Sequence, residues 1–244
     1  MTGIEPLRGA IALAPLLASR DRIAAAARAI APLLNRVVFT GRQVAPYLET
    51  SPLSTGERAT FADDAVVRVI STGALDRIAA DLLRLGLVRG ARSGTNERWK
   101  VDESLTLEFT QVSGLETDPG AIWLEYASLL TMAVDVGDGL RARITGAPAL
   151  LALDWAAFRA GGESPLDSGE LEDIIALVAG RSEVVRELAA APPELRAFVT
   201  AETRRFLEYQ GAGHVMQSAI PGARHLPALV DRVAERLRSI AASG

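Results

Sequence analysis

Several kinds of residue are missing or scarce in this chain of 244 residues, and each shortage excludes a class of chemistry. There is no cysteine, which excludes disulfide bonds, thiolate nucleophiles and cysteine-ligated zinc or iron–sulfur centres. Lys100 is the only lysine and follows Trp99, so the chain has no Walker phosphate loop. Aromatic residues make up 5% of the chain against 49% apolar residues, which favours helices that pack through aliphatic side chains.

Long apolar runs are also missing. The most apolar windows, Ile11 to Leu17 and Ala147 to Leu153, are far shorter than the roughly 20 residues that a membrane-spanning helix needs. The N-terminus has Glu5 before a short apolar run and lacks a basic leader of the signal-peptide type. We therefore expect a cytoplasmic protein that does not contact a membrane.

Charge is divided unevenly along the chain. Residues 1–100 carry a net charge of +5 and residues 101–244 a net charge of −9, which together give the −4 of the whole chain. A basic part joined to an acidic part indicates that the two parts meet different partners. Chance and an ordinary solvated surface would give the same division.

The segment from Ser71 to Lys100 has the clearest pattern in the sequence. Leu75, Ile78 and Leu82 follow one another at helical spacing, which predicts a helix with one apolar face. Gly86 is placed to end that helix, because glycine readily adopts the backbone conformation found after a helix C-terminus.

A basic hairpin is predicted directly after this helix. Residues 87–89 and 98–101 read as two short strands around the turn-prone residues 93–96. A helix that ends in Leu-x-x-Leu-Gly-Leu-Val, followed by an Arg-rich hairpin, resembles the winged-helix superfamily over about residues 20–112. The string that carries the resemblance is DLLRLGLVRGARSGTNERWKV.

The resemblance implies contact with DNA. In that superfamily the helix before the hairpin usually enters the major groove, and the hairpin lies along the backbone. Asp76 and Asp81 disfavour base reading by this helix, which leaves backbone contact or docking to a protein. Trp99 either stacks on a base or fills the core beneath the hairpin. The expected phosphate contacts are Arg77 and Arg84 on the helix, and Arg89, Arg92, Arg98 and Lys100 in the hairpin.

The rest of the chain is expected to be mainly helical. Residues 37–39 and 105–109 read as strands, whereas residues 61–70 read as a helix. The predicted fold class is therefore mainly α, with a winged-helix-like α/β module in residues 1–115 and an acidic all-α domain in residues 116–244. The helices expected in the second domain span residues 120–136, 147–160, 169–179, 182–190, 193–209 and 227–241.

No catalytic motif stands out. Gly137-Asp138-Gly139 lacks the strand–turn–helix context of a dinucleotide-binding loop. His214 and His225 are the only histidines, and they read as surface or capping residues rather than metal ligands. The acidic groups at residues 63–64 and 170–173 lie at expected helix starts, where the helix dipole accounts for them. We expect no enzymatic activity, no cofactor and no metal.

These observations predict a non-catalytic DNA-associated protein, a regulator or a subunit of a DNA-handling complex, whose Arg-rich hairpin binds the nucleic-acid backbone. Residues 116–244 would bind a protein partner or form a homodimer. Two alternatives stay open. One is a subunit of a multi-protein assembly that docks through the winged helix, and the other is a ligand-sensing transcriptional regulator.

Overall fold

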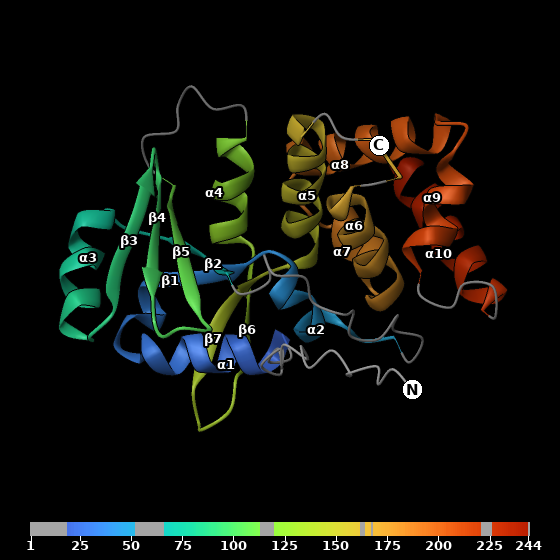
Figure 1. Ribbon diagram of the computed structural model, residues 1–244. Helices are drawn as coiled ribbons and strands as arrows, with labels where there is room; N and C mark the ends of the chain where they lie inside the picture. The colour runs from blue at the N-terminus through green and yellow to red at the C-terminus, as the bar shows by residue number, and fades with distance from the viewer. Residues whose placement is uncertain are drawn as a thin grey trace, which may run out of the picture.

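The computed structural model of this chain describes residues 19–51, 66–112, 120–161, 164–166, 168–220 and 226–243. A mixed β-sheet lies on one side of the molecule and a bundle of helices on the other (Figure 1). The seven strands are β1 (Val37–Thr40), β2 (Val66–Ser71), β3 (Val88–Ser93), β4 (Asn96–Lys100), β5 (Thr106–Gln111), β6 (Thr131–Asp135) and β7 (Arg141–Thr145). Their order across the sheet is β3-β4-β5-β2-β1-β7-β6.

Helices pack on the sheet and form the bundle. In the described ranges, no helix combines the length and the apolar character that crossing a membrane requires. The helices are α1 (Ser19–Ala29), η1 (Ala31–Arg36), η2 (Arg42–Val44), α2 (Ala45–Leu48), α3 (Leu75–Arg84), α4 (Ala121–Leu129), α5 (Ala147–Gly161), α6 (Gly169–Gly180), α7 (Val184–Ala189), α8 (Pro193–Glu208), α9 (Ala212–Ala219) and α10 (Pro227–Ala241).

Strands β2 and β5 run parallel at the centre of the sheet. Val67 pairs with Leu107 and Val69 with Phe109, and all four side chains are fully buried. Between these strands the chain forms α3 and the β3–β4 hairpin, and then returns as β5. The hairpin is therefore the outer part of a crossover that joins two parallel strands.

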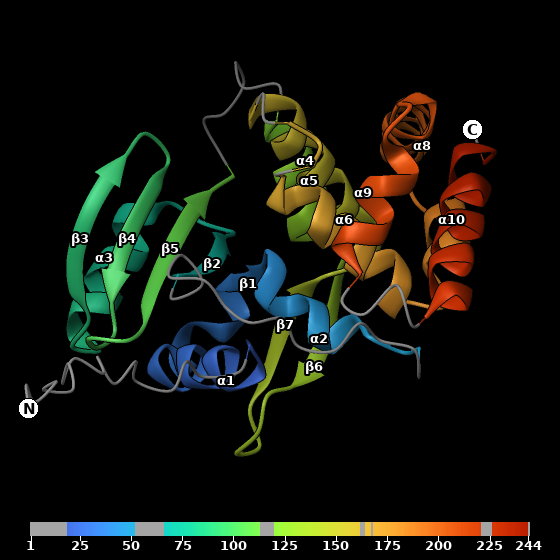
Figure 2. The same cartoon turned by 45° about the vertical axis from the view of Figure 1, so that its right-hand side comes forward.

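Apolar side chains on alternate strand residues build a core against α3. Leu107 and Phe109 point to the same face as Trp99 of β4, since alternate residues of a strand share a face. The buried residues of α3, among them Ile78 and Leu82, supply the other side of this core. Figure 2 shows α3 behind the hairpin.

The helical bundle is centred on α5, which contacts α4, α6, α7 and α8. Trp155 of α5 is 1% exposed, and its ring centroid lies 6.0 Å from that of Phe206 on α8. Thr145 at the end of β7 donates a hydrogen bond to the carbonyl of Ala127 on α4. The bundle and the sheet are thus joined directly where β7 leads into α5.

The winged-helix resemblance and the predicted fold class are both wrong. The predicted helix and hairpin do form, as α3 and β3–β4, but β4 pairs with β5, and β5 pairs with β2 to enter a seven-stranded sheet. The second half of the chain is not all-α either, because β6 and β7 complete that sheet. A helix followed by a hairpin is a local pattern that occurs both in winged-helix domains and in this seven-stranded sheet. The spacing of residues within such a pattern does not predict which strands, distant in sequence, pair with one another.

One predicted helix is a strand in its described part, and another is shorter than expected and is followed by a strand. Residues 66–70 belong to β2, while residues 61–65 lie outside the described ranges. The helix expected over residues 120–136 ends at Leu129, and β6 follows it. Short apolar runs do not distinguish a helix from a buried strand by periodicity. Strands β6 and β7 come after the domain boundary expected at residues 115/116, and they belong to the same sheet as β1. The division of the chain into two domains stays a prediction.

An ion pair between the exposed Arg89 of β3 and the buried Glu97 of β4 links the two strands of the hairpin. Glu97 is 0% exposed, and its Oε1 accepts a hydrogen bond from Nε of Arg89. The guanidinium of Arg89 also lies over Trp99, with 5.7 Å between its central carbon and the ring centroid. Trp99 is 1% exposed, which confirms its place in the core and excludes stacking on a base.

We expect Arg89→Ala to lower the free energy of unfolding, because the buried Glu97 carboxylate loses its partner. Urea unfolding measures this loss, and the double substitution Arg89→Ala/Glu97→Gln should recover much of it. Arg92→Ala is the matched control, since Arg92 and Asp76 pair at exposed positions, where such pairs contribute about 0–1 kcal/mol. Equal losses for the two arginines would contradict this account of the hairpin.

Candidate functional site

The face of β4, β5 and β2 opposite α3 is polar and open to solvent. Arg68 lies on β2, a strand with neighbours on both sides, and its side chain is nevertheless exposed. Helix α4 contacts β1 and β2 along the same face, as Thr145 and its partner Ala127 show. We define the open face by the residues that share this side of the three strands: Arg68, Asn96, Arg98, Lys100, Thr106, Glu108 and Thr110.

Charged side chains form a row across the open face. Arg98, Glu108 and Arg68 occupy directly paired positions on β4, β5 and β2. Nε of Arg98 donates a hydrogen bond to Oε2 of Glu108 at 2.6 Å, and the Glu108 side chain is 15% exposed. Glu108 therefore fixes the guanidinium of Arg98 from a position between the two arginines.

Two further cations lie on the open face. Arg68 and Lys100 are both exposed, and neither forms a side-chain ion pair or hydrogen bond within the described part of the chain. Unpaired cations beside a fixed Arg98 give this face an excess of positive charge. Such a surface attracts anions, and guanidinium groups bind phosphate and carboxylate oxygens especially well.

An ion pair between η2 and α6 lies at the margin of the open face. Gly41 has φ 80°, a conformation that favours glycine, and it turns the chain from β1 into η2, which carries Arg42. A methyl group on Gly41 would lie 3.4 Å from Cδ of Arg68. Nε of Arg42 donates to Oδ2 of Asp173 on α6 at 3.1 Å, so this pair joins the sheet to the bundle.

Asp154 on α5 belongs to the same charged group. Its burial raises the pKa of the carboxyl well above the usual range, and the negative charge of Asp173 raises it further. The positive charge of Arg68 acts in the opposite direction. The environment of Asp154 thus favours its uncharged form next to the arginines.

A buried hydroxyl group lies beside the open face, on β1. Thr40 lies opposite Arg68 in the β1–β2 register and is 5% exposed. Its Oγ1 has no hydrogen-bond partner among the described residues. Groups of three or more metal-ligating side chains that could hold an ion are absent from the ranges that the structure describes. The exposed donors of the open face are those of its arginines and its lysine, which suit an anion.

The six residues expected to contact phosphate lie on several surfaces. Arg98 and Lys100 are on the open face, whereas Arg89 is engaged by buried Glu97 on the other side of the hairpin. Arg77 and Arg84 are on α3, away from the open face, and Arg84 pairs with Asp81. Arg92 pairs with Asp76. Phosphate contact by these six side chains stays a prediction: Arg77, Arg84, Arg89, Arg92, Arg98 and Lys100.

Sequence reasoning missed Arg68, Arg42 and Asp154. Arg68 interrupts the apolar run Val66-Val67-Arg68-Val69-Ile70, and a single charge inside a β-branched run was the available signal. Arg42 and Asp154 have no such signal, because only the packing of η2 and α5 brings them near the sheet. Of the two histidines, His214 is exposed on α9, and His225 lies outside the described ranges.

The fold has a counterpart among solved structures. The chain is similar to an antigenic nucleotidyltransferase-like protein from Paracoccidioides brasiliensis, seen in a crystal structure, with a TM-score of 0.47 and 15% identity. The match covers 89% of this chain and 92% of that chain. The sequence matches no protein-family model and no curated protein. A likeness of this degree assigns neither a family nor an activity.

Two expectations are corrected at this point. The expectation of a protein without enzymatic activity is withdrawn, because the matching structure is described as nucleotidyltransferase-like. The winged-helix and DNA-binding descriptions are withdrawn with the fold on which they depended. Contact with a protein partner, or a homodimer through residues 116–244, stays a prediction.

The raised pKa of Asp154 predicts a pH-dependent stability. An aspartate in the unfolded chain has a pKa of about 3.9. Because the pKa of Asp154 is raised on folding, the folded state binds the proton of this carboxyl more tightly than the unfolded state does. Stability attributable to Asp154 therefore falls as pH rises from about 4 through the raised pKa. We expect Asp154→Asn to raise Tm by a few degrees near pH 8, because asparagine carries no charge at any pH.

Thermal unfolding of both proteins across this pH range measures the difference. The gain should shrink as the pH falls toward 4, where the wild-type carboxyl is itself protonated. Asp231→Asn, at an exposed position on α10, gives the background for the same chemical change. A gain at Asp154 that does not vary with pH would argue against an electrostatic cause.

Proposed function

We propose that this chain binds a small molecule with two or more phosphate groups on the open face of the sheet. The observation that carries the proposal is the exposure of Arg68 on an interior strand, with Lys100 on the same face and no ion pair or hydrogen bond of either side chain among the described residues. No ion pair or hydrogen bond within the described residues accounts for a guanidinium at this place on an interior strand. Ligand binding gives a reason for its presence there.

The spacing of the cations supports a ligand with several phosphate groups. Arg98 and Arg68 lie on either side of β5, so their backbones are about 10 Å apart, given roughly 4.8 Å between neighbouring strands. Glu108 holds Arg98 and separates the two guanidinium groups. Different phosphate groups of one ligand would then meet different cations, each through charge-assisted hydrogen bonds.

The residues at the margin of the open face support an anionic ligand as well. Asp173 is engaged by Arg42, and the raised pKa of Asp154 favours an uncharged carboxyl. Both effects lessen the repulsion that these carboxylates would otherwise exert on phosphate. Arg68 is left as the group that faces the ligand from the centre of the sheet.

Calorimetric titration with tripolyphosphate and with the four common nucleoside triphosphates tests the proposal. We expect sub-millimolar binding at low ionic strength that weakens as salt screens the charges. Arg68→Ala and Lys100→Ala should each raise Kd about ten- to a hundredfold, since a hydrogen bond to a charged group contributes about 1.5–3 kcal/mol. If the nucleotides bind more tightly than tripolyphosphate does, the protein also contacts the nucleoside part of the ligand.

Arg77→Ala is the matched control, because Arg77 is also exposed but belongs to α3 on the opposite side of the sheet. Its Kd should equal that of the wild type. The proposal is wrong if tripolyphosphate and the nucleotides produce no heat at low salt. It is also wrong if Arg77→Ala weakens binding as much as Arg68→Ala does.

A further inference from the structure

The two edges of the seven-stranded sheet differ in how they are protected. Strand β3 forms one edge, and a bulge between Arg89 and Arg92 interrupts its pairing with β4. Bulges and charged side chains hinder an edge strand from pairing with another chain. Strand β6 forms the other edge, pairs with β7 in unbroken register, and has Asp135 as its only charged residue. The edge of β6 is therefore the one better suited to a further strand.

Alternate residues of β6 present their backbone groups to this edge. The N–H of Val136 donates to the carbonyl of Leu140 at 3.1 Å, just after the strand. The N–H of Gly146 donates to the carbonyl of Leu130 at 2.8 Å, just before it. Hydrogen-bonded and non-hydrogen-bonded pairs alternate along antiparallel strands. The even-numbered residues of β6 therefore bond to β7, and the odd-numbered ones turn their N–H and C=O groups to the edge.

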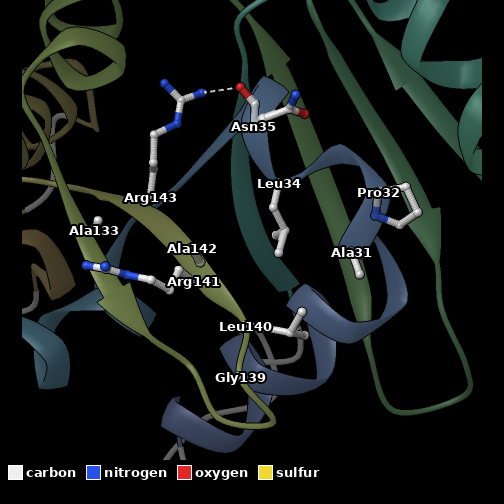
Figure 3. Close-up of a pocket in the computed structure, with 10 residues that line it drawn as sticks. All are labelled: Ala31, Pro32, Leu34, Asn35, Ala133, Gly139, Leu140, Arg141, Ala142 and Arg143. Carbon is white, nitrogen blue, oxygen red and sulfur yellow. Dashed lines mark hydrogen bonds between the residues drawn. The ribbon is translucent and has the colours of Figure 1, made fainter.

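The outward backbone groups belong to Thr131, Ala133 and Asp135. They form no hydrogen bond within the described part of the chain. The side chains of Ala133 and Asp135 are exposed. Figure 3 shows Ala133 on the strand beside β7, whose residues Arg141 and Arg143 are also drawn. A row of unpaired N–H and C=O groups of this kind is a template for another strand.

The sequence of β6 is complementary to itself when two copies run antiparallel. About a two-fold axis at Ala133, the two Ala133 residues face each other, and each Thr131 faces the Asp135 of the other copy. The aspartates then stay apart, and each carboxylate can accept a hydrogen bond from a threonine hydroxyl. Met132 faces Val134 on the other side of the sheet, so the apolar face continues from one copy into the next.

From this geometry we infer that two copies of the chain pair antiparallel along β6, about a two-fold axis at Ala133, so that their sheets join. The outward N–H and C=O groups of each copy then bond to those of the other. A two-fold contact uses the same surface on both copies and closes at a dimer. Pairing of β6 with β3 of another copy runs head to tail, does not close, and meets the bulge of β3. The interface lies within residues 116–244, the part of the chain expected to self-associate.

Sedimentation velocity of the full chain from micromolar to submillimolar concentration tests the dimer, for which we expect twice the mass of one chain. Ala133→Glu brings two carboxylates together at the axis and should raise the Kd of the dimer at least about tenfold. Within one copy the new side chain lies across from Arg143, which favours the native fold. Ala91→Glu is the matched control on the other edge strand, β3, and should leave this Kd unchanged.

Cross-linking tests the register, because the chain has no cysteine and a single introduced thiol reports on one pair. The Cα atoms of a hydrogen-bonded antiparallel pair are about 5.5 Å apart, within the reach of a disulfide bond. Mild oxidation should therefore link two copies of Ala133→Cys. Two Thr131 residues lie about 14 Å apart along the strand, at roughly 3.4 Å per residue. Thr131→Cys should therefore remain unlinked.

Three results contradict the inference, and circular dichroism confirms that each variant is folded. One is the mass of a single chain at every concentration. Another is a mass that keeps rising with concentration, which indicates head-to-tail pairing of β6 with β3. The third is cross-linking of Thr131→Cys as fast as that of Ala133→Cys. Because Ala133→Cys is a small change at an exposed position, it decides the matter even if Ala133→Glu fails to fold.

Discussion

The parallel pairing of β2 with β5 is the constraint on which the rest of the structure depends. It places two fully buried apolar pairs at the centre of the sheet and ties the β3–β4 hairpin to the strands around it. It also aligns Arg98, Glu108 and Arg68 in one row across three strands. Without this pairing the hairpin would project from α3 as a separate ribbon, and the open face would not exist.

Ion pairing decides which of the arginines remain available to a ligand. Arg89 is committed to buried Glu97, and Arg98 to Glu108. The pairs that Arg84 and Arg92 form on the surface contribute little to stability but do reduce the local charge. The arginines and the lysine of residues 71–100 look alike in the sequence. In the structure some are held by strand carboxylates, some are neutralised at the surface, and Lys100 has neither kind of partner among the described residues. The two cations of the open face that form no ion pair or hydrogen bond among the described residues, Arg68 and Lys100, define the candidate site.

Prediction from the sequence succeeded where the information is local. The helical spacing of Leu75, Ile78 and Leu82 and the turn at residues 93–96 produced the helix and hairpin that the structure contains. It failed for β2 and β6, whose short apolar runs fit a helix equally well. Lys100 and Arg98 were among the predicted contacts because they lie in the hairpin. Arg68 was not, since its role depends on a strand partner about forty residues away.

The sequence by itself determined that disulfide and thiolate chemistry are excluded, that a helix precedes a basic hairpin, and that charge is divided between the two parts of the chain. Only the tertiary structure decided that these pieces join one seven-stranded sheet and that η2, α5 and α6 carry Arg42, Asp154 and Asp173 to its margin. The physical reason is that helix periodicity and turn chemistry act over a few residues, whereas strand pairing and charge neutralisation act between residues that meet only on folding. The candidate site is made entirely of contacts of the second kind.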